Sequence, residues 1–246
     1  MGVADLVPGI SGGTVALITG IYKELIKSID HIKLSTIFTL FRKGFKAFWK
    51  NINGPFLMAL FGGIITSILL FSRLIEYLIE NESVRLWALF FGLLVASIIY
   101  LIKENKIYST LSIGLVLLGM VISASMSFFT PSTIELNYPY LFFCGLIAIS
   151  AMILPGLSGA YILMILGAYK LILSTVRKAQ DLLFAFDSEL FYEVFSILGV
   201  FIFGIVVGIK LFSKVLYWLF KKYPNNTIAV LVGLMVGALH KVWPWQ

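Results

Sequence analysis

Val7-Pro8-Gly9-Ile10-Ser11-Gly12-Gly13-Thr14 interrupts apolar sequence near the start of the chain, and a related stretch, Leu154-Pro155-Gly156-Leu157-Ser158-Gly159-Ala160-Tyr161, occurs once more. We call them the first and second breaker motifs. The first leads into Gly20-Ile21-Tyr22-Lys23 and the second into Gly167-Ala168-Tyr169-Lys170. Proline lacks an amide hydrogen and glycine is a poor helix former, so neither motif suits a continuous helix. The sequence therefore predicts two broken helical segments.

The composition around these motifs is that of a membrane protein. Of the 246 residues, 60% are hydrophobic and 13% are charged, against about 25% charged in soluble domains. The mean hydropathy is +0.99. The net charge of +7 favours an anionic lipid surface as partner and argues against nucleic acid, because no soluble basic domain is present to hold it. The composition thus predicts an all-α polytopic membrane protein.

Apolar runs of about 20 residues can cross the bilayer, and the chain has several. We expect spans at about 55–79, 84–103, 109–129, 194–220 and 226–244, a broken segment over 139–173, and a mixed-charge connection over 174–193. Residues 30–54 alternate basic and aromatic side chains, which is typical of a helix lying in the membrane interface. An ordinary solvated loop is the alternative for that connection.

Further internal similarity indicates a duplicated chain. Phe71-Ser72-Arg73-Leu74 is echoed by Phe212-Ser213-Lys214-Val215, and residues 91–96 are echoed by 232–237. We divide the chain into a first half (1–108), a linking transmembrane helix (109–136) and a second half (137–246). Three spans separate the two breaker segments, so the second half is expected to be inverted relative to the first. Inverted repeats with two broken or re-entrant hairpins are typical of transporters with a substrate site near the bilayer midplane.

Lysine and arginine predict the orientation, because they are enriched on the cytoplasmic side. One face collects most of them: Lys27, Lys33, Arg42, Lys43, Lys46, Lys50, Lys103, Lys106, Lys221 and Lys222. This places the 30–54 connection in the cytoplasm and the C-terminus outside. Only Met1 to Leu6 precede the first breaker motif, so its hairpin is either short or begins upstream of this sequence.

The breaker motifs carry groups that can bind an anion. A half-helix that begins after a break presents unpaired N–H groups, and phosphate is a common ligand of such ends. The candidate substrate-binding residues are Ser11, Gly12, Gly13, Thr14, Ser158, Gly159 and Tyr161. The alternative role for small residues is close helix packing, which we favour for Gly20, Gly62, Gly63, Gly92, Gly167, Gly204 and Gly233.

Charged residues within apolar segments form a second group of candidates, because a charge at membrane depth is costly. Lys210 and Arg73 are candidates for neutralising a phosphate, and Asp5 and Glu76 for binding a coupling ion. For Arg73 and Glu76 the alternative is a side chain that reaches the interface from a span end. No metal-ligand spacing, nucleotide-binding glycine loop or nucleophile with a nearby base occurs, so we expect no metal, no cofactor and no enzyme activity.

With both motifs described, the chain resembles the bacterial polyprenyl-phosphate translocase family. The resemblance rests on Gly2 to Thr14 with Gly20-Ile21-Tyr22, and on Pro155 to Gly159 with Gly167-Ala168-Tyr169. It implies a flippase in the bacterial plasma membrane that returns undecaprenyl phosphate, an anionic polyprenyl-phosphate lipid, from the outer to the inner leaflet for carrier-lipid recycling in cell wall biogenesis. Ala160 departs from the pattern, since a small hydroxyl residue would be more typical there.

Three alternatives stay open on the sequence alone. They are a transporter or channel for a small soluble anion, a membrane lipid phosphatase, and a scaffold without transport activity. The exact polyprenol, the coupling ion and the oligomeric state, including a homo-oligomer, are not fixed by the sequence.

Overall fold

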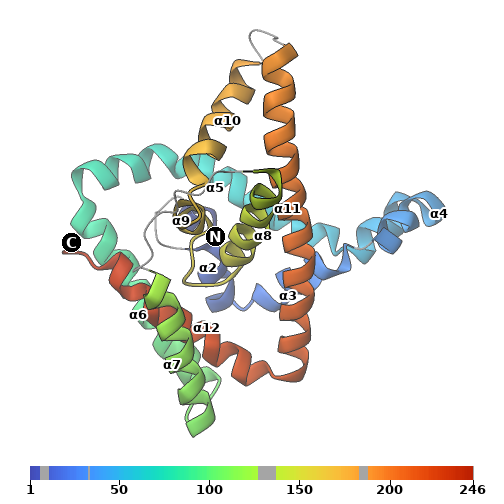
Figure 1. Ribbon diagram of the computed structural model, residues 1–246. Coiled ribbons are helices and arrows are strands. Elements are labelled where there is room, and N and C mark those ends of the chain that lie inside the picture. Colours follow the sequence, from blue (N-terminus) through green and yellow to red (C-terminus); the bar gives the residue numbers. More distant parts are fainter. Residues whose placement is uncertain (6–10, 33, 127–136, 183–187, 246) are drawn as a thin grey trace. The chain divides into compact units, whose positions relative to one another are not determined.

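The structure is a computed structural model, and it describes residues 1–5, 11–32, 34–126, 137–182 and 188–245. Within these ranges the chain is helical and contains no strand (Figure 1). The helices are α1 (Gly2–Asp5), α2 (Gly12–Ile18), α3 (Tyr22–His31), α4 (Leu34–Asn51), α5 (Gly54–Asn81), α6 (Ser83–Glu104), α7 (Thr110–Ser125), α8 (Tyr138–Ile153), α9 (Gly159–Ile165), α10 (Tyr169–Asp181), α11 (Ser188–Lys222), α12 (Pro224–Ala238) and the 3₁₀ helix η2 (Leu239–Val242).

Several of these helices are long and apolar enough to cross a membrane. In the described part of the chain these are α5, α6, α11 and Pro224–Val242, and Gly159–Ile165 with Tyr169–Ala179 would form a fifth span bent by 114°. Two shorter apolar helices, α7 and α8, have 16 residues each. The expectation of an all-α polytopic membrane protein is therefore confirmed. The inversion of the two halves stays a prediction.

Two of the expected boundaries need correction. The 174–193 connection is mostly helical, because α10 continues to Asp181 and α11 begins at Ser188. The expected span 109–129 is a helix only over Thr110–Ser125, and residues 127–136 lie outside the described residues. The 30–54 connection contains the 18-residue helix α4, which bends at Gly44 (φ 80°).

The chain forms two compact units. Unit 1 comprises Met1–Ser127, Leu154–Leu157 and Ser213–Gln246, and unit 2 comprises Phe128–Ile153 and Ser158–Phe212. Helix α11 therefore begins in unit 2 and ends in unit 1. These units are spatial, and the division of the sequence into halves at 108 and 137 stays a prediction.

Unit 1 is held together by close backbone contacts between α7 and α12. A Cβ on Gly233 would collide with the Val116 carbonyl, and one on Gly119 would collide with the Val230 carbonyl. This confirms close packing for Gly233. The prediction of close packing was wrong for Gly62, Gly63 and Gly92. No described atom lies within 4 Å of the Cβ position at any of the three.

A second contact in unit 1 fixes the start of the chain. Helix α1 packs on α5, where a Cβ on Gly2 would meet Ser67 and the backbone of Ile64. Val3 packs against a buried cluster formed by Ile75 with Leu86 and Phe90 of α6. The short helix before the first breaker motif is therefore anchored to two long helices.

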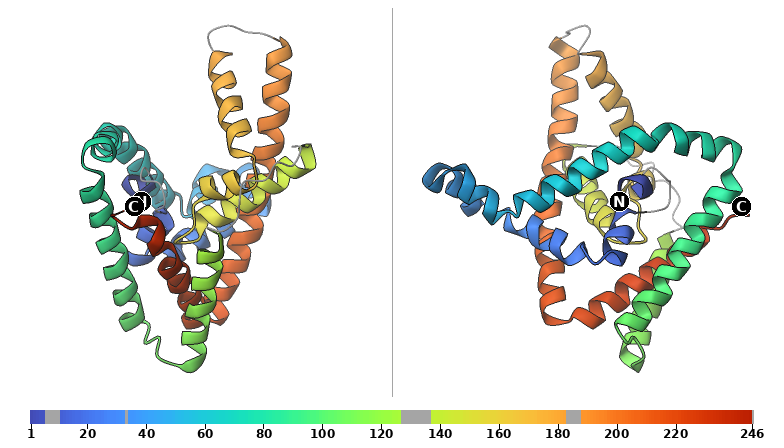
Figure 2. Two further views of the ribbon diagram at one scale, coloured as in Figure 1. Left: turned by 60° about the vertical axis from the view of Figure 1, so that its left-hand side comes forward. Right: turned by 180° about the vertical axis from the view of Figure 1, so that it is seen from behind.

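Unit 2 packs α8 against α11 in the same way. Gly204 lies against the Phe142 carbonyl, which confirms close packing for this glycine as well. Helix α10 runs beside the first turns of α11 (Figure 2), where Lys178 Nζ and Glu193 Oε1 form an ion pair at 2.6 Å. Burial of apolar side chains around Leu141 and Phe201 supports this packing.

Candidate functional site

The described part of the first breaker motif is the start of α2. Ser11 has extended backbone angles (φ −113°, ψ 134°) and caps the helix, because its Oγ accepts the N–H of Gly13 at 3.1 Å. Serine is a preferred residue at this position for that reason. Residues 6–10, which include Pro8 and Gly9, lie outside the described residues. Ser11, Gly12, Gly13 and Thr14 are all buried.

Asp5 provides a carboxylate at the same helix end. The N–H of Gly12 donates to Asp5 Oδ1 at 2.6 Å. A Cβ on Gly12 would lie within 2.9 Å of the Asp5 carboxyl carbon, so glycine leaves the space in which this carboxylate sits. An anionic oxygen is favourable at a helix N-terminus because unpaired N–H groups point toward it.

The two breaker motifs meet inside unit 1. The N–H of Gly156 donates to Thr14 Oγ1 at 3.3 Å, across 142 residues of sequence. The Thr14 side chain is only 2% exposed. Gly156 has φ +82°, and a Cβ there would meet the backbone of Leu234 and Met235 on α12. Position 156 therefore requires glycine both for its backbone conformation and for its packing.

Gly156 was not among the site residues predicted from the sequence. The pair Pro155-Gly156 could have indicated it, because a Pro-Gly pair is typical of a turn in which glycine takes a positive φ. That turn exposes a backbone donor. The identity of its acceptor depends on which other segment packs against it.

The rest of the second motif begins α9 in unit 2. Ser158 caps this helix through its Oγ, which accepts the N–H of Tyr161 at 3.5 Å. Gly159 packs against the Ala148 carbonyl. Tyr161 is partly exposed.

The two motifs share a local structure. Helices α2 and α9 each have seven residues and a serine cap. Each is followed by a glycine with positive φ, Gly20 at 77° and Gly167 at 71°. A left-handed backbone, which glycine adopts without strain, explains both glycines. Close packing was the wrong role for Gly20, because no described atom lies within 4 Å of its Cβ position, and it stays a prediction for Gly167.

The other charged candidates lie on the long helices α5 and α11. Arg73 and Glu76 are exposed on α5 in unit 1, and neither has an ion-pair partner in the part of the chain that the structure describes. Glu76 lines a shallow hollow of about 330 Å³ with Glu80. Lys210 is half-buried on α11 in unit 2. Asp5 contacts the first breaker motif, because its Oδ1 accepts the N–H of Gly12.

The long apolar helices and the buried junction of two helix breaks define a multi-pass α-helical membrane protein. The chain belongs to the undecaprenyl phosphate translocase-like family, which it matches over residues 1–246.

Two curated relatives carry the name polyprenyl-phosphate transporter. The protein from Vibrio cholerae is 37% identical over 246 residues, which cover 100% of this chain and 75% of that protein. The protein from Staphylococcus aureus is 29% identical over 256 residues, which cover 99% of this chain and 83% of that protein. No solved structure matches the chain significantly.

Proposed function

We propose that this protein transports polyprenyl phosphate across the membrane. The family to which it belongs and the names of its two relatives support this substrate class. The helices long enough to span a bilayer support a transport role. Following the family resemblance, the proposed direction is from the outer to the inner leaflet, with undecaprenyl phosphate recycled as the carrier lipid.

The phosphate is proposed to bind where the breaker motifs meet. The observation that carries this proposal is the hydrogen bond between Thr14 Oγ1 and the N–H of Gly156. It joins two interrupted helical segments, and polar groups at such breaks in an apolar environment are satisfied by protein, water or a ligand. The Asp5 carboxylate, which accepts the N–H of Gly12, supports this proposal because a charged oxygen already binds at this helix end.

Such a site would lower the barrier to moving a charged headgroup. An unpaired charge in hydrocarbon is prohibitive, whereas N–H and hydroxyl donors replace the water that the phosphate loses. The polyprenyl chain is apolar and would stay in the lipid beside the protein. Rocking of one inverted half against the other would open the site to each leaflet in turn.

The remaining candidates have supporting roles in this proposal. Ser158, Gly159 and Tyr161 would supply donors from the second motif, and Lys210 and Arg73 would balance the phosphate charge. Asp5 and Glu76 would bind a coupling ion. The proposed orientation has the 30–54 connection in the cytoplasm and the C-terminus outside.

Leaflet exchange in liposomes tests the function. Purified protein is reconstituted with labelled undecaprenyl phosphate, and exchange is compared for the unchanged protein, Gly12→Leu and Gly62→Leu. We expect Gly12→Leu to stop exchange, since its side chain would fill the space of the Asp5 carboxylate. Gly62→Leu is the matched control, because the described structure leaves open space at that position.

The assay also separates the rival functions. Exchange of lipid that is equal in all three proteins would refute the proposal. Uptake of soluble phosphate without lipid exchange would indicate an anion channel, and release of phosphate from the lipid would indicate a phosphatase.

A further inference from the structure

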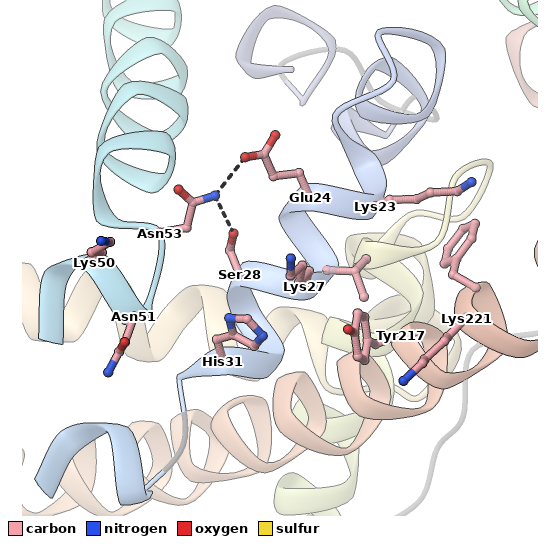
Figure 3. A pocket seen from close by; sticks show the side chains of 12 residues that line it. Lys23, Glu24, Lys27, Ser28, His31, Lys50, Asn51, Asn53, Tyr217 and Lys221 are labelled. Atoms are coloured by element: carbon pink, nitrogen blue, oxygen red, sulfur yellow. Dashed lines mark hydrogen bonds between the residues drawn. The ribbon is translucent and has the colours of Figure 1, made fainter. Parts of the chain in front are cut away.

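Unit 1 contains a cavity of about 820 Å³ that none of the described breaker-motif residues line. Helix α3, the joint between α4 and α5, and the last turns of α11 form its walls (Figure 3). Four lysines from these three elements line it: Lys23, Lys27, Lys50 and Lys221. Basic residues far apart in the sequence thus line one hollow.

The charge in this cavity is unbalanced. Glu24 is the one carboxylate among the lining residues, and its Oε1 accepts a hydrogen bond from Asn53 Nδ2 at 2.8 Å. None of the four lysines has an ion-pair partner within the described ranges. Lys23 Nζ instead lies 5.6 Å from the centre of the Phe220 ring. A hollow in which positive charge predominates concentrates anions, which favours an anionic ligand.

The walls are held in place by interactions between the elements. Asn53 adopts a left-handed conformation (φ 57°), and its amide donates to both Glu24 and Ser28 of α3, as Figure 3 shows. Tyr22 makes an edge contact with Phe220, with ring centres 5.7 Å apart. The cavity is therefore formed before a ligand enters, which reduces the ordering that binding requires.

The surroundings point to a lipid as the source of the anion. Helix α4, which contributes Lys50, exposes Phe38 and Phe45 by 58% and 61%, and Phe45 stacks on Trp49. Exposed aromatic and basic side chains on one helix are typical of a segment in the membrane interface. Ile26 and Phe220 add apolar surface to the cavity itself. Basic hollows in such places bind lipid headgroups.

We infer that this cavity binds the phosphate headgroup of a membrane lipid, as a second anion site separate from the breaker motifs. The inference depends on the proposed function only for the identity of the lipid. If the lipid is the transported polyprenyl phosphate, the cavity is a docking site that holds the headgroup at the face carrying Lys27, Lys50 and Lys221.

Photolabelling tests directly whether a lipid phosphate binds in this cavity. The whole protein in detergent is irradiated with a photoreactive farnesyl phosphate, and labelled peptides are identified by mass spectrometry. We expect label in residues 23–31 and 217–221. The pair Lys27→Gln with Lys221→Gln should reduce that label about tenfold or more, because each lysine supplies a charge-assisted contact. Lys27→Arg with Lys221→Arg should retain it.

The control is Lys103→Gln with Lys106→Gln, which removes the same charge at exposed positions outside the cavity. An equal loss of label in this control would overturn the inference, as would label confined to the breaker motifs. The unchanged protein gives the peptide map by itself, so the result does not depend on the folding of a variant.

Competition identifies the lipid. Displacement by unlabelled farnesyl phosphate alone supports a polyprenyl-phosphate site, and displacement by phosphatidylglycerol as well supports a general lipid-phosphate site. Equal displacement by farnesol or inorganic phosphate would overturn it. Leaflet exchange without label in this cavity would refute the inference alone, whereas label without exchange would refute the proposed transport alone.

Discussion

Replacing Thr14 by valine tests the junction between the breaker motifs. Valine keeps nearly the same shape but removes the oxygen that accepts the N–H of Gly156 at 3.3 Å. Thr14 is 2% exposed, so no bulk water reaches the orphaned amide. A buried donor without an acceptor costs about 1–3 kcal/mol, and the long distance of this bond favours the lower half of that range. We expect Thr14→Val to fold with a melting temperature lowered by several degrees.

The effect on transport should be larger than that of a merely structural change. If the junction positions the phosphate donors, a loss of about 1.4 kcal/mol in the rate-limiting complex slows exchange about tenfold. Thr14→Ser is the control, because it keeps the hydroxyl and loses a methyl group at a cost of about 1 kcal/mol. Leaflet exchange in liposomes and thermal unfolding in detergent are measured for both variants.

The comparison of the two variants tests whether Thr14 positions the phosphate donors or contributes packing only. We expect Thr14→Ser to retain exchange despite some loss of stability, and Thr14→Val to lose it. Exchange that follows stability alone, with serine and valine equally impaired, would show that Thr14 contributes packing only. Normal exchange by Thr14→Val would refute the role of the junction altogether.

Three further outcomes are expected. Gly233→Leu should destabilise the fold by about 1–3 kcal/mol or more, since its side chain has no room against α7, whereas Gly62→Leu should leave thermal unfolding nearly unchanged. Asn53→Gly should keep the left-handed turn but lose the bonds to Glu24 and Ser28, lowering stability by about 1 kcal/mol, which chemical denaturation would detect. Gly167→Ala should cost about 1 kcal/mol by placing a Cβ in a left-handed conformation, and an unchanged melting temperature would contradict this.

Much of the fold follows from local properties of the sequence. The length and polarity of the apolar runs set the positions of α5, α6, α11 and α12 to within a few residues over most of their length. The main exception is the start of α11, which was expected at about residue 194 and lies at Ser188. The charged residues Glu189 and Glu193 made this stretch look like part of a connection. Charge near a helix end does not stop the helix when neighbouring residues are good helix formers.

The candidate site could be predicted only in part. Proline and glycine in the breaker motifs indicated helix breaks, because those preferences depend on residues within one turn. The caps that Ser11 and Ser158 form were not predicted, although serine is a preferred residue at a helix start. Close packing could not be assigned to individual glycines. Gly233 and Gly62 look alike in sequence, yet one faces the backbone of α7 and the other faces open space.

The sequence by itself determined the class of membrane protein and the two helix breaks. Only the tertiary structure decided that Thr14 accepts the amide of Gly156 and that Lys27, Lys50 and Lys221 line one cavity. The physical reason is the range of the interactions. Helix length, capping and left-handed glycines depend on neighbouring residues, whereas a contact across 142 residues depends on how the helices pack together.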